Sequence, residues 1–101
     1  MLKKLEEEMP IDVKQIDDDD FKVVVSSDGI THHKVKVTDI AYYRYTVGNI
    51  NKTQLVTKAF FFLLQKEPNI SILADFTIQN IEQYFPEFRD IGTMNCLDVS
   101  I

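Results

Sequence analysis

Two runs rich in β-branched residues flank a short turn, and they constrain the fold more than any other part of the sequence. The runs are FKVVVSS, residues 21–27, and ITHHKVKV, residues 30–37, and the turn contains Asp28-Gly29. Such runs on either side of an Asp-Gly pair are typical of a β-hairpin. The sequence therefore predicts a hairpin over residues 21–37.

Burial of one face determines the register of this hairpin, because a shift of one residue turns every side chain to the other face. A two-residue loop at Asp28-Gly29 would set the valines of one strand against the lysines of the other. A three-residue loop that begins at Ser27 instead pairs Val25 with Thr31 and places Gly29 at the left-handed position of a G1 bulge. We therefore predict the three-residue loop, with an apolar face formed by Phe21, Val23, Val25, Val35 and Val37.

From Thr38 onward the apolar residues follow a helical spacing. Thr38 is a candidate N-cap for a short helix in DIAYYRY, which the segment VGNI ends. Asn51 is a candidate N-cap for a longer helix, KTQLVTKAFFFLLQKE, with Gln54 at the capping-box position and Pro68 just past its end. A third helix, IQNIEQYF, is expected after a cap at Thr77.

These elements predict an α+β fold in which about three helices cover one face of the hairpin. We expect an acidic N-terminal arm at residues 1–20, a single α+β domain at 21–91 and a C-terminal tail at 92–101. The end of the tail, MNCLDVSI, alternates apolar and polar residues, so it could widen the hairpin as an extra strand, in its own subunit or in a neighbour's. The expected core consists of Phe21, Val23, Val25, Val35, Val37, Ile40, Leu55, Ala59, Phe60, Phe62, Leu63, Ile72, Leu73, Phe76, Ile81 and Phe85.

The net charge of -5 is unevenly distributed along the chain. Residues 1–20 hold 3 basic and 8 acidic side chains, whereas residues 21–101 hold 8 of each. A neutral domain lacks the basic surplus of a nucleic-acid-binding protein, so we expect no nucleic acid as a partner. The DDDD block at residues 17–20 lacks the ligand spacing and turn glycine of a calcium loop, and we expect it to remain solvated.

The cysteine content and the hydropathy pattern indicate the cellular compartment. Cys96 is the only cysteine, which is typical of a reducing compartment. The N-terminus has no apolar stretch of a secretory signal, and the apolar run at residues 59–64 is far shorter than the ~20 residues of a membrane-spanning helix. We therefore expect a cytoplasmic protein with no membrane partner.

That apolar run, AFFFLL, belongs mostly to one buried face of its helix, but Phe61 falls on the polar side. A single exposed aromatic residue is common and need have no function. Aromatic residues also anchor interfaces, so Phe61 is a candidate partner contact. Tyr42, Arg44 and Tyr45 have the composition of interface residues and are further candidates, with Tyr43 expected to pack inward.

His33 is the candidate polar site. His32 and His33 are neighbours on a strand and point to opposite faces, so they cannot bind one metal ion together. We expect His33 to be hydrogen-bonded at the edge of the core, and the alternative is general acid–base catalysis. The three glycines are isolated, which excludes a phosphate-binding loop. The sequence therefore indicates no catalytic, cofactor-binding or metal-binding residues, and no cofactor.

Several segments together resemble a family of small bacterial proteins of unknown function. They are His33-Lys34-Val35-Lys36-Val37, Tyr42-Tyr43, AFFFLLQKEPNISILADF and IQNIEQYFPEF. The family pattern is H-x-V-x-V, a tyrosine helix, S-F-x-F-L-L-x-x-E-P-x-x-S-I-L, an aspartate or threonine cap and Y-F-P-E, and the match covers roughly residues 31 to 87. The resemblance implies a small cytoplasmic α+β domain and assigns no catalytic residue. At the position of Phe61 the family usually carries a polar or charged residue.

Three functions remain open from the sequence. The first, which we favour, is a non-enzymatic protein-interaction module that self-associates as a homodimer or binds a protein partner through Phe61, the sheet edge or the tail. The second is a small ligand-binding protein or enzyme that uses His33. The third is a nucleic-acid-associated protein, which would need a cluster of cations that the composition does not indicate.

Overall fold

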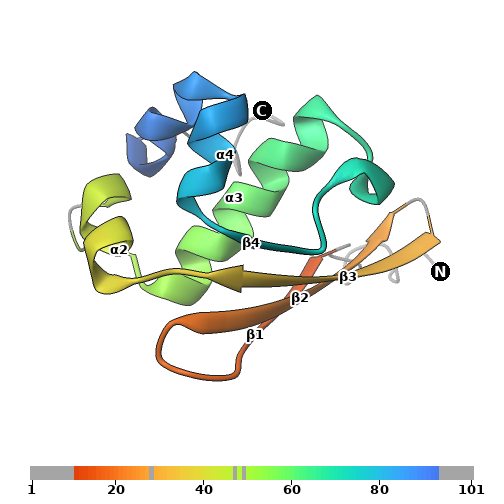
Figure 1. The fold of residues 1–101 in the computed structure, drawn as a ribbon, viewed down its shortest axis with the longest axis horizontal. Coiled ribbons are helices and arrows are strands. Elements are labelled where there is room, and N and C mark those ends of the chain that lie inside the picture. The colour runs from red at the N-terminus through yellow and green to blue at the C-terminus, as the bar shows by residue number, and fades with distance from the viewer. Residues whose placement is uncertain (1–10, 28, 47, 49, 94–101) are drawn as a thin grey trace, which may run out of the picture.

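A computed structural model of the chain describes residues 11–27, 29–46, 48 and 50–93. In this part of the chain, a four-stranded sheet forms one layer and the helices form a second layer on one of its faces (Figure 1). The α+β fold expected from the sequence is thus confirmed. The predicted tail strand, Cys96 and the first ten residues of the predicted arm lie outside the described residues.

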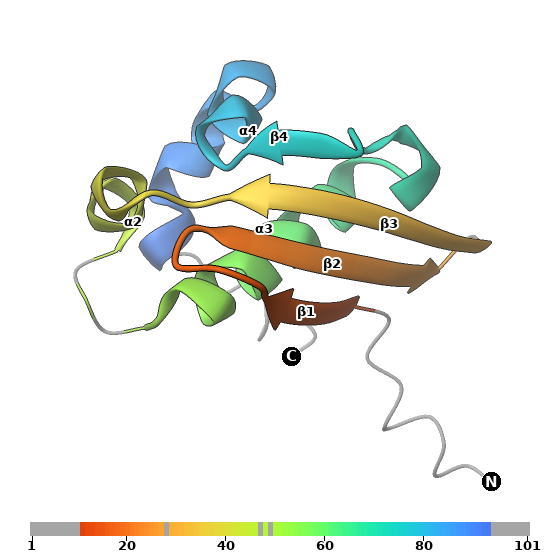
Figure 2. The ribbon, with the colours of Figure 1, turned by 60° about the horizontal axis from the view of Figure 1, so that its bottom comes forward.

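The strands of the sheet lie in the order β1-β2-β3-β4 (Figure 2). They are β1, Ile11–Gln15; β2, Asp20–Ser27; β3, Gly29–Lys36; and β4, Asp75–Thr77. The first three strands form an antiparallel meander, and β4 returns to pair in parallel with β3. Helix α3 runs behind the strands in Figure 2, so the sheet has one covered face, the inner face, and one open face.

The register between β2 and β3 confirms the three-residue loop. Val25 is opposite Thr31 and Phe21 is opposite Val35, which gathers the apolar side chains on the inner face. Gly29 has a φ of +86°, a conformation that glycine adopts without the steric cost of a Cβ atom. Burial of the alternating valines therefore determines the register, as the sequence indicates.

Strand β1 corrects the predicted boundary of the acidic arm. Ile11 and Val13 alternate with Asp12 and Lys14, and this alternation places Ile11, which is buried, on the inner face against Val25. Residues 11–20 are therefore part of the folded domain rather than of an arm. The DDDD block at residues 17–20 lies in and just after the turn between β1 and β2, where the Ile16 N–H donates to the Asp20 carbonyl.

Three α-helices and two 3₁₀ helices make up the second layer in the described residues: α2, Asp39–Tyr45; α3, Lys52–Lys66; α4, Gln79–Tyr84; η1, Asn69–Ser71; and η2, Pro86–Thr93. Two predicted caps are confirmed, since Thr38 Oγ1 accepts from the Ala41 N–H and Asn51 forms a capping box with Gln54. The predicted cap at Thr77 is wrong. Thr77 ends β4, and its own N–H donates to Asn80 Oδ1.

Most of the predicted core is buried, with three exceptions. Ile40 is 82% exposed and Leu73 is 50% exposed, and Phe85 is only partly buried. In α2 it is Ala41 and Tyr45, one turn apart, that face the core, so Ile40 and Tyr43 point outward. The helix is too short for its apolar pattern to determine its orientation. The core also includes residues that the sequence analysis missed: Ile11, Ala41, Tyr45, Val56, Ile78, Phe88 and Ile91.

Candidate functional site

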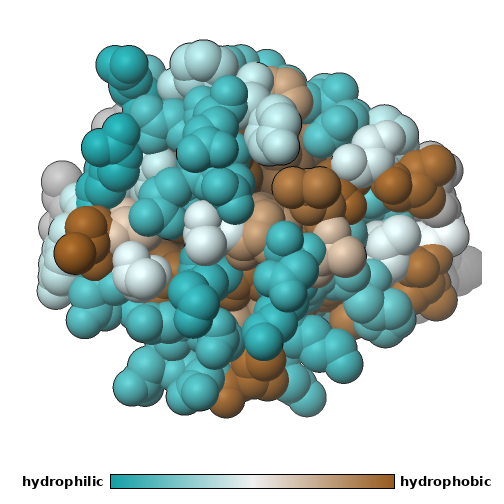
Figure 3. All heavy atoms as spheres, viewed as in Figure 1, coloured by the Kyte–Doolittle hydropathy of each residue, from teal (hydrophilic) through white to brown (hydrophobic). Residues whose placement is uncertain are grey.

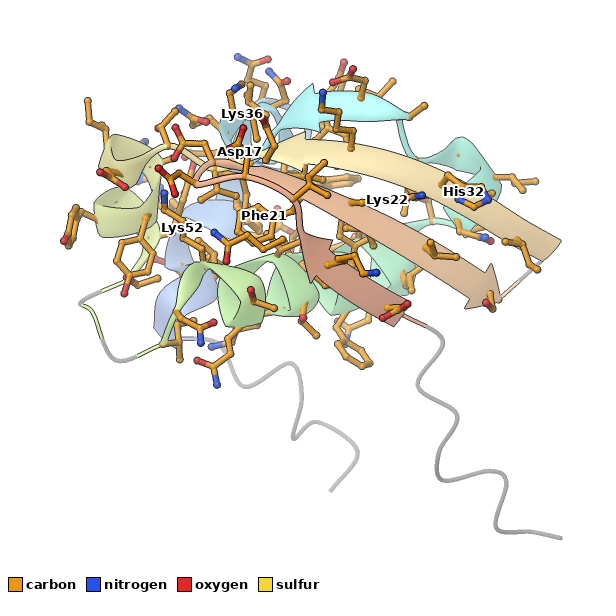
Figure 4. All side chains as sticks on the ribbon, turned by 90° about the horizontal axis from the view of Figure 1, so that it is seen from below. Asp17, Phe21, Lys22, His32, Lys36 and Lys52 are labelled. Atoms are coloured by element: carbon orange, nitrogen blue, oxygen red, sulfur yellow. The ribbon has the colours of Figure 1, made fainter. Side chains whose placement is uncertain are left out.

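Three lysines form a row across the open face of the sheet. Because the inner positions of β2 and β3 are apolar, the alternate positions face away from the helices. The register sets Lys22 opposite Lys14 on one side and opposite Lys34 on the other. We call Lys14, Lys22 and Lys34 the lysine row. Figure 4 looks onto the open face, with Lys22 and its neighbours His32 and Lys36 labelled.

The lysines of the row differ from Lys36, Lys52 and Lys66, each of which forms an ion pair. Lys52 bonds Asp19 and Asp39, each at 2.8 Å, and Lys66 bonds Glu87 at 2.7 Å. Lys36, two positions beyond Lys34, lies 3.2 Å from Asp20. Within the part of the chain that the structure describes, the three lysines of the row form no ion pair.

The composition of the open face limits the ligands that it can bind. Its side chains belong to Asp12, Lys14, Asp20, Lys22, Val24, Ser26, Ile30, His32, Lys34, Lys36, Asp75 and Thr77. None of these residues is Phe, Tyr or Trp, so the described open face has no aromatic platform for stacking bases. Like charges opposite one another destabilise a sheet, and a bound anionic group would relieve that repulsion.

A second feature is an apolar pocket on the side of the molecule shown in Figure 3, which has hydrophobic side chains at the surface between α4 and η1. Its volume is about 200 Å³. Leu73 and Tyr84, which are 50% and 66% exposed, contribute to its wall. The lining residues are Leu63, Glu67, Ser71, Ile72, Leu73, Phe76, Asn80, Ile81, Tyr84 and Phe85.

A buried polar network holds one wall of this apolar pocket in place. Nδ1 of His33 lies 2.8 Å from the Leu73 carbonyl, and a carbonyl can only accept, so Nδ1 carries a proton. Asn69, which is fully buried, donates to Thr31 Oγ1 at 2.8 Å, and Thr31 Oγ1 is 2.8 Å from His33 Nε2. In the neutral tautomer, the Thr31 hydroxyl therefore donates to Nε2. The network ties β3 to the segment from residue 69 to residue 73.

The same network describes the state of His33, the candidate polar site. The side chain is 3% exposed and packs against Phe60, with ring centroids 5.4 Å apart. Both ring nitrogens have partners, so neither is free to exchange a proton with a substrate. This agrees with the expected hydrogen-bonded histidine at the edge of the core. The geometry gives no support to general acid–base catalysis by His33.

Arg44 and Tyr45 connect α2 to α4. Both Oε atoms of Glu82 accept from Arg44, at 3.1 and 3.0 Å, and Glu82 also accepts from the Tyr45 hydroxyl at 2.8 Å. The Arg44 guanidinium lowers the pKa of Glu82. Burial, followed by the hydrogen bond to Glu82, raises the pKa of Tyr45 to about 12. These two candidate contacts therefore already have partners within the chain.

The other candidate contacts, Tyr42 and Phe61, are partly buried against the core. The Tyr42 hydroxyl donates to the Ile50 carbonyl. Neither the complete lysine row nor the apolar pocket was predicted from the sequence. The predicted pairing of residues 21–27 with residues 30–37 implies that Lys22 faces Lys34, but the position of Lys14 beside them depends on the pairing of β1 with β2, which the sequence did not predict. No sequence signal marks the apolar pocket, because Leu73 lies between regular elements.

The described residues contain neither a metal-binding cluster nor a membrane-spanning helix. Across residues 11–27, 29–46, 48 and 50–93, no group of three His, Cys, Asp or Glu residues could hold a metal ion. None of the helices in that same part of the chain has the length and apolar character needed to cross a membrane. Comparison with protein-family models, with curated proteins and with solved structures found no match to the chain.

Proposed function

We propose that the protein is a non-enzymatic protein-interaction module whose lysine row binds an acidic segment of a partner protein. The observation that carries the proposal is the register, which places Lys14, Lys22 and Lys34 directly opposite one another on an open face. Folding gains nothing from this arrangement, because like charges opposite one another cost stability. An acidic ligand would offset the repulsion among the lysines, because each lysine would be attracted to the ligand's carboxylates.

The geometry suits a short segment that lies across the strands. Neighbouring strands are about 4.8 Å apart, so three lysines on three strands extend over roughly 10 Å. Two carboxylates with one residue between them in a strand, or two residues between them in a helix, lie on one face of their segment. Their spacing is comparable to that between neighbouring lysines of the row. Each exposed ion pair contributes only about 0–1 kcal/mol, so the binding should be weak and sensitive to salt.

A protein partner fits the open face better than a nucleic acid does. Single-stranded nucleic acids are bound by stacking on aromatic residues as well as by cations, and the described open face carries no aromatic side chain. Asp12 and Asp75 lie next to the lysine row and interrupt the positive surface, so the row suits a short acidic segment that contacts three lysines rather than a long phosphate backbone.

Fluorescence anisotropy with a labelled Glu-rich peptide tests the proposal. The variant K14Q/K22Q/K34Q removes the lysine row, and K58Q/K66Q/R89Q removes the same total charge elsewhere. We expect the wild type and the control variant to bind the peptide, the row variant to lose binding, and added salt to weaken it. Equal loss of peptide binding in both variants would show that net charge alone governs the binding, which would overturn the proposal.

An oligothymidylate of matched charge serves as the competing probe. Tighter binding of this oligonucleotide than of the peptide, with the same dependence on the lysine row, would replace the protein partner by a nucleic acid. Absence of binding to either probe at low salt would contradict the proposal altogether.

Self-association is one form that this function could take. Asp17 and Asp18 are exposed in the turn between β1 and β2 and complement the lysine row of a second copy. The homodimer expected from the sequence is tested by light scattering over a range of protein concentrations. A dimer that dissociates in K14Q/K22Q/K34Q would make a second copy the partner. A dimer that dissociates only in Phe61→Glu would place the interface on α3 instead.

We also propose that the module acts in a bacterial cytoplasm. The support is the resemblance over residues 31–87 described above, together with the single cysteine of the chain. Fractionation of cells that express a tagged protein would test the location, and recovery from the membrane or the secreted fraction would contradict it.

A further inference from the structure

The apolar pocket has the construction of a preformed binding site. Its walls come from the end of α3, from the segment around η1 and β4, and from α4. The His33–Leu73 hydrogen bond and the buried Asn69 hold the wall that contains Leu73. A preformed cavity requires little ordering when a ligand binds, which favours affinity.

One charged residue, Glu67, lines the apolar pocket. Glu82 is paired with Arg44, and Glu87 with Lys66. Among the described residues, Glu67 forms no ion pair. It is the C-cap residue of α3, where the carbonyl groups of the last turn add negative potential. The charge at this end of the apolar pocket is therefore complementary to a cation.

The size of the apolar pocket limits its ligand. Its volume is about 200 Å³, whereas an engineered cavity of about 150 Å³ in another protein binds benzene. The space therefore fits one ring with a short chain. Apart from Glu67, the lining is mainly apolar, with Leu63, Ile81 and Phe85 among its residues.

We propose that this pocket binds a small molecule with an apolar body of ring size and a protonated amine. The body contacts Leu63, Ile81 and Phe85, and the ammonium group donates to the Glu67 carboxylate. The exposed Leu73 and Tyr84 cover the bound molecule at the rim. This site is separate from the lysine row, because it has the opposite charge and lies on the helical side of the sheet.

The chemistry of the site argues against other occupants. The tail beyond the described residues contains Leu97, Val99 and Ile101, but it also carries Asp98, which Glu67 would repel. A second copy could insert its own exposed Leu73, but this side chain brings no cation to Glu67.

A titration of the full chain with phenethylamine, followed by amide NMR shifts, tests the proposal. We expect saturable shifts confined to the segments that line the apolar pocket. The matched compounds are 2-phenylethanol, which lacks the charge, and 3-phenylpropionate, which reverses it. The alcohol should bind about tenfold more weakly than the amine, because its hydroxyl can still donate to Glu67 but lacks the positive charge that strengthens the hydrogen bond of the ammonium group, and the propionate should not bind.

Two substitutions connect the affinity to Glu67. Glu67→Gln should weaken phenethylamine binding by about tenfold, whereas Glu87→Gln, which removes a charge outside the pocket, should leave it unchanged. Glu67→Ala provides a second test if the Gln variant is poorly folded, as its spectrum would show. Equal affinity for the amine and the alcohol, or an affinity indifferent to Glu67, would overturn the proposed amine specificity.

Two further outcomes would overturn the site itself. The absence of shifts at the lining residues would exclude phenethylamine as a ligand of the apolar pocket. Shifts at the same residues that depend on protein concentration without ligand would show that a second copy occupies it.

Discussion

Alternate residues of the same strands form the two faces of the sheet, but the apolar inner face stabilises the fold whereas the lysine row on the open face does not. On the inner face, Phe21, Val23 and Val25 are fully buried. On the open face, Lys14, Lys22 and Lys34 lie opposite one another. The inner face is arranged as folding requires, because burial of apolar surface is the main source of stability. The lysine row of the open face is arranged against folding, because its aligned charges repel.

This difference separates the residues that stabilise the fold from those available for binding. A register that buries the valines necessarily aligns the lysines on the other side, since side chains alternate along a strand. The inner face should therefore be sensitive to substitution. The open face should tolerate substitution and even gain stability from it.

The largest effect is expected from Phe60→Ala. Phe60 is fully buried and contacts the rings of His33 and Phe76. Its loss should lower the free energy of unfolding by about 3–5 kcal/mol, measured by urea denaturation. Phe61→Ala, at the next position but only partly buried, is the matched control and should cost less. Equal costs at the two positions would remove the distinction between buried and peripheral residues of α3.

The buried polar network should have the next largest effect. Asn69→Ala removes the donor to Thr31 Oγ1, and we expect the free energy of unfolding to fall by about 1–3 kcal/mol. The exposed amide of Gln83 is the control, since Gln83→Ala should change stability by less than about 0.5 kcal/mol. Amide NMR should also show changes at Leu73, whose carbonyl bonds His33. An unchanged free energy of unfolding in Asn69→Ala would show that the stability of the inner face depends on apolar contacts alone.

Tyr45, in the helical layer, should make the free energy of unfolding depend on pH. Its pKa is raised to about 12, first by burial and then by the hydrogen bond to Glu82. The ordinary pKa of tyrosine is about 10, so the folded state favours the neutral phenol. The resulting stability is fully present below about pH 10 and is lost as the pH rises towards 12.

Urea denaturation at several pH values measures this effect. Other groups titrate in the same range, so the difference between the wild type and Tyr45→Phe isolates the contribution of Tyr45. We expect the advantage of the wild type to decrease with rising pH. A constant difference between the two proteins would contradict the raised pKa.

The smallest change in stability is expected from Lys22→Glu, and it should be an increase, whereas most substitutions lower stability. This substitution changes three aligned positive charges into alternating charges, and it should raise the free energy of unfolding by about 0.2–1 kcal/mol at low salt. It should also abolish binding of the Glu-rich peptide. Lys66→Glu, which breaks an ion pair with Glu87, is the control and should lower stability slightly. Destabilisation by Lys22→Glu would refute the claim that the lysine row is unfavourable for folding.

Much of the fold could be predicted because its signals are local. The caps at Thr38 and Asn51 follow from the hydrogen-bonding groups of those side chains. Strand β4 and the exposure of Leu73 could not be predicted, because a strand of three residues carries no periodic pattern. The orientation of α2 was predicted wrongly, since Ile40 and Tyr45 are both apolar and packing alone selects Tyr45.

The hairpin register, the buried face of α3 and the caps at Thr38 and Asn51 follow from local patterns, because alternation, helical spacing and capping act between near neighbours in the chain. Three features became visible only in the folded chain: β1 joins the sheet, three distant lysines become a row, and Glu67 lines an apolar pocket. Those features depend on which distant segments pack together. Lys22 and Lys34 come from the neutral stretch of residues 21–101 and Lys14 from the acidic N-terminal segment, yet they meet in one row, because electrostatic interactions depend on distance in space and not on the sum of charge along the chain.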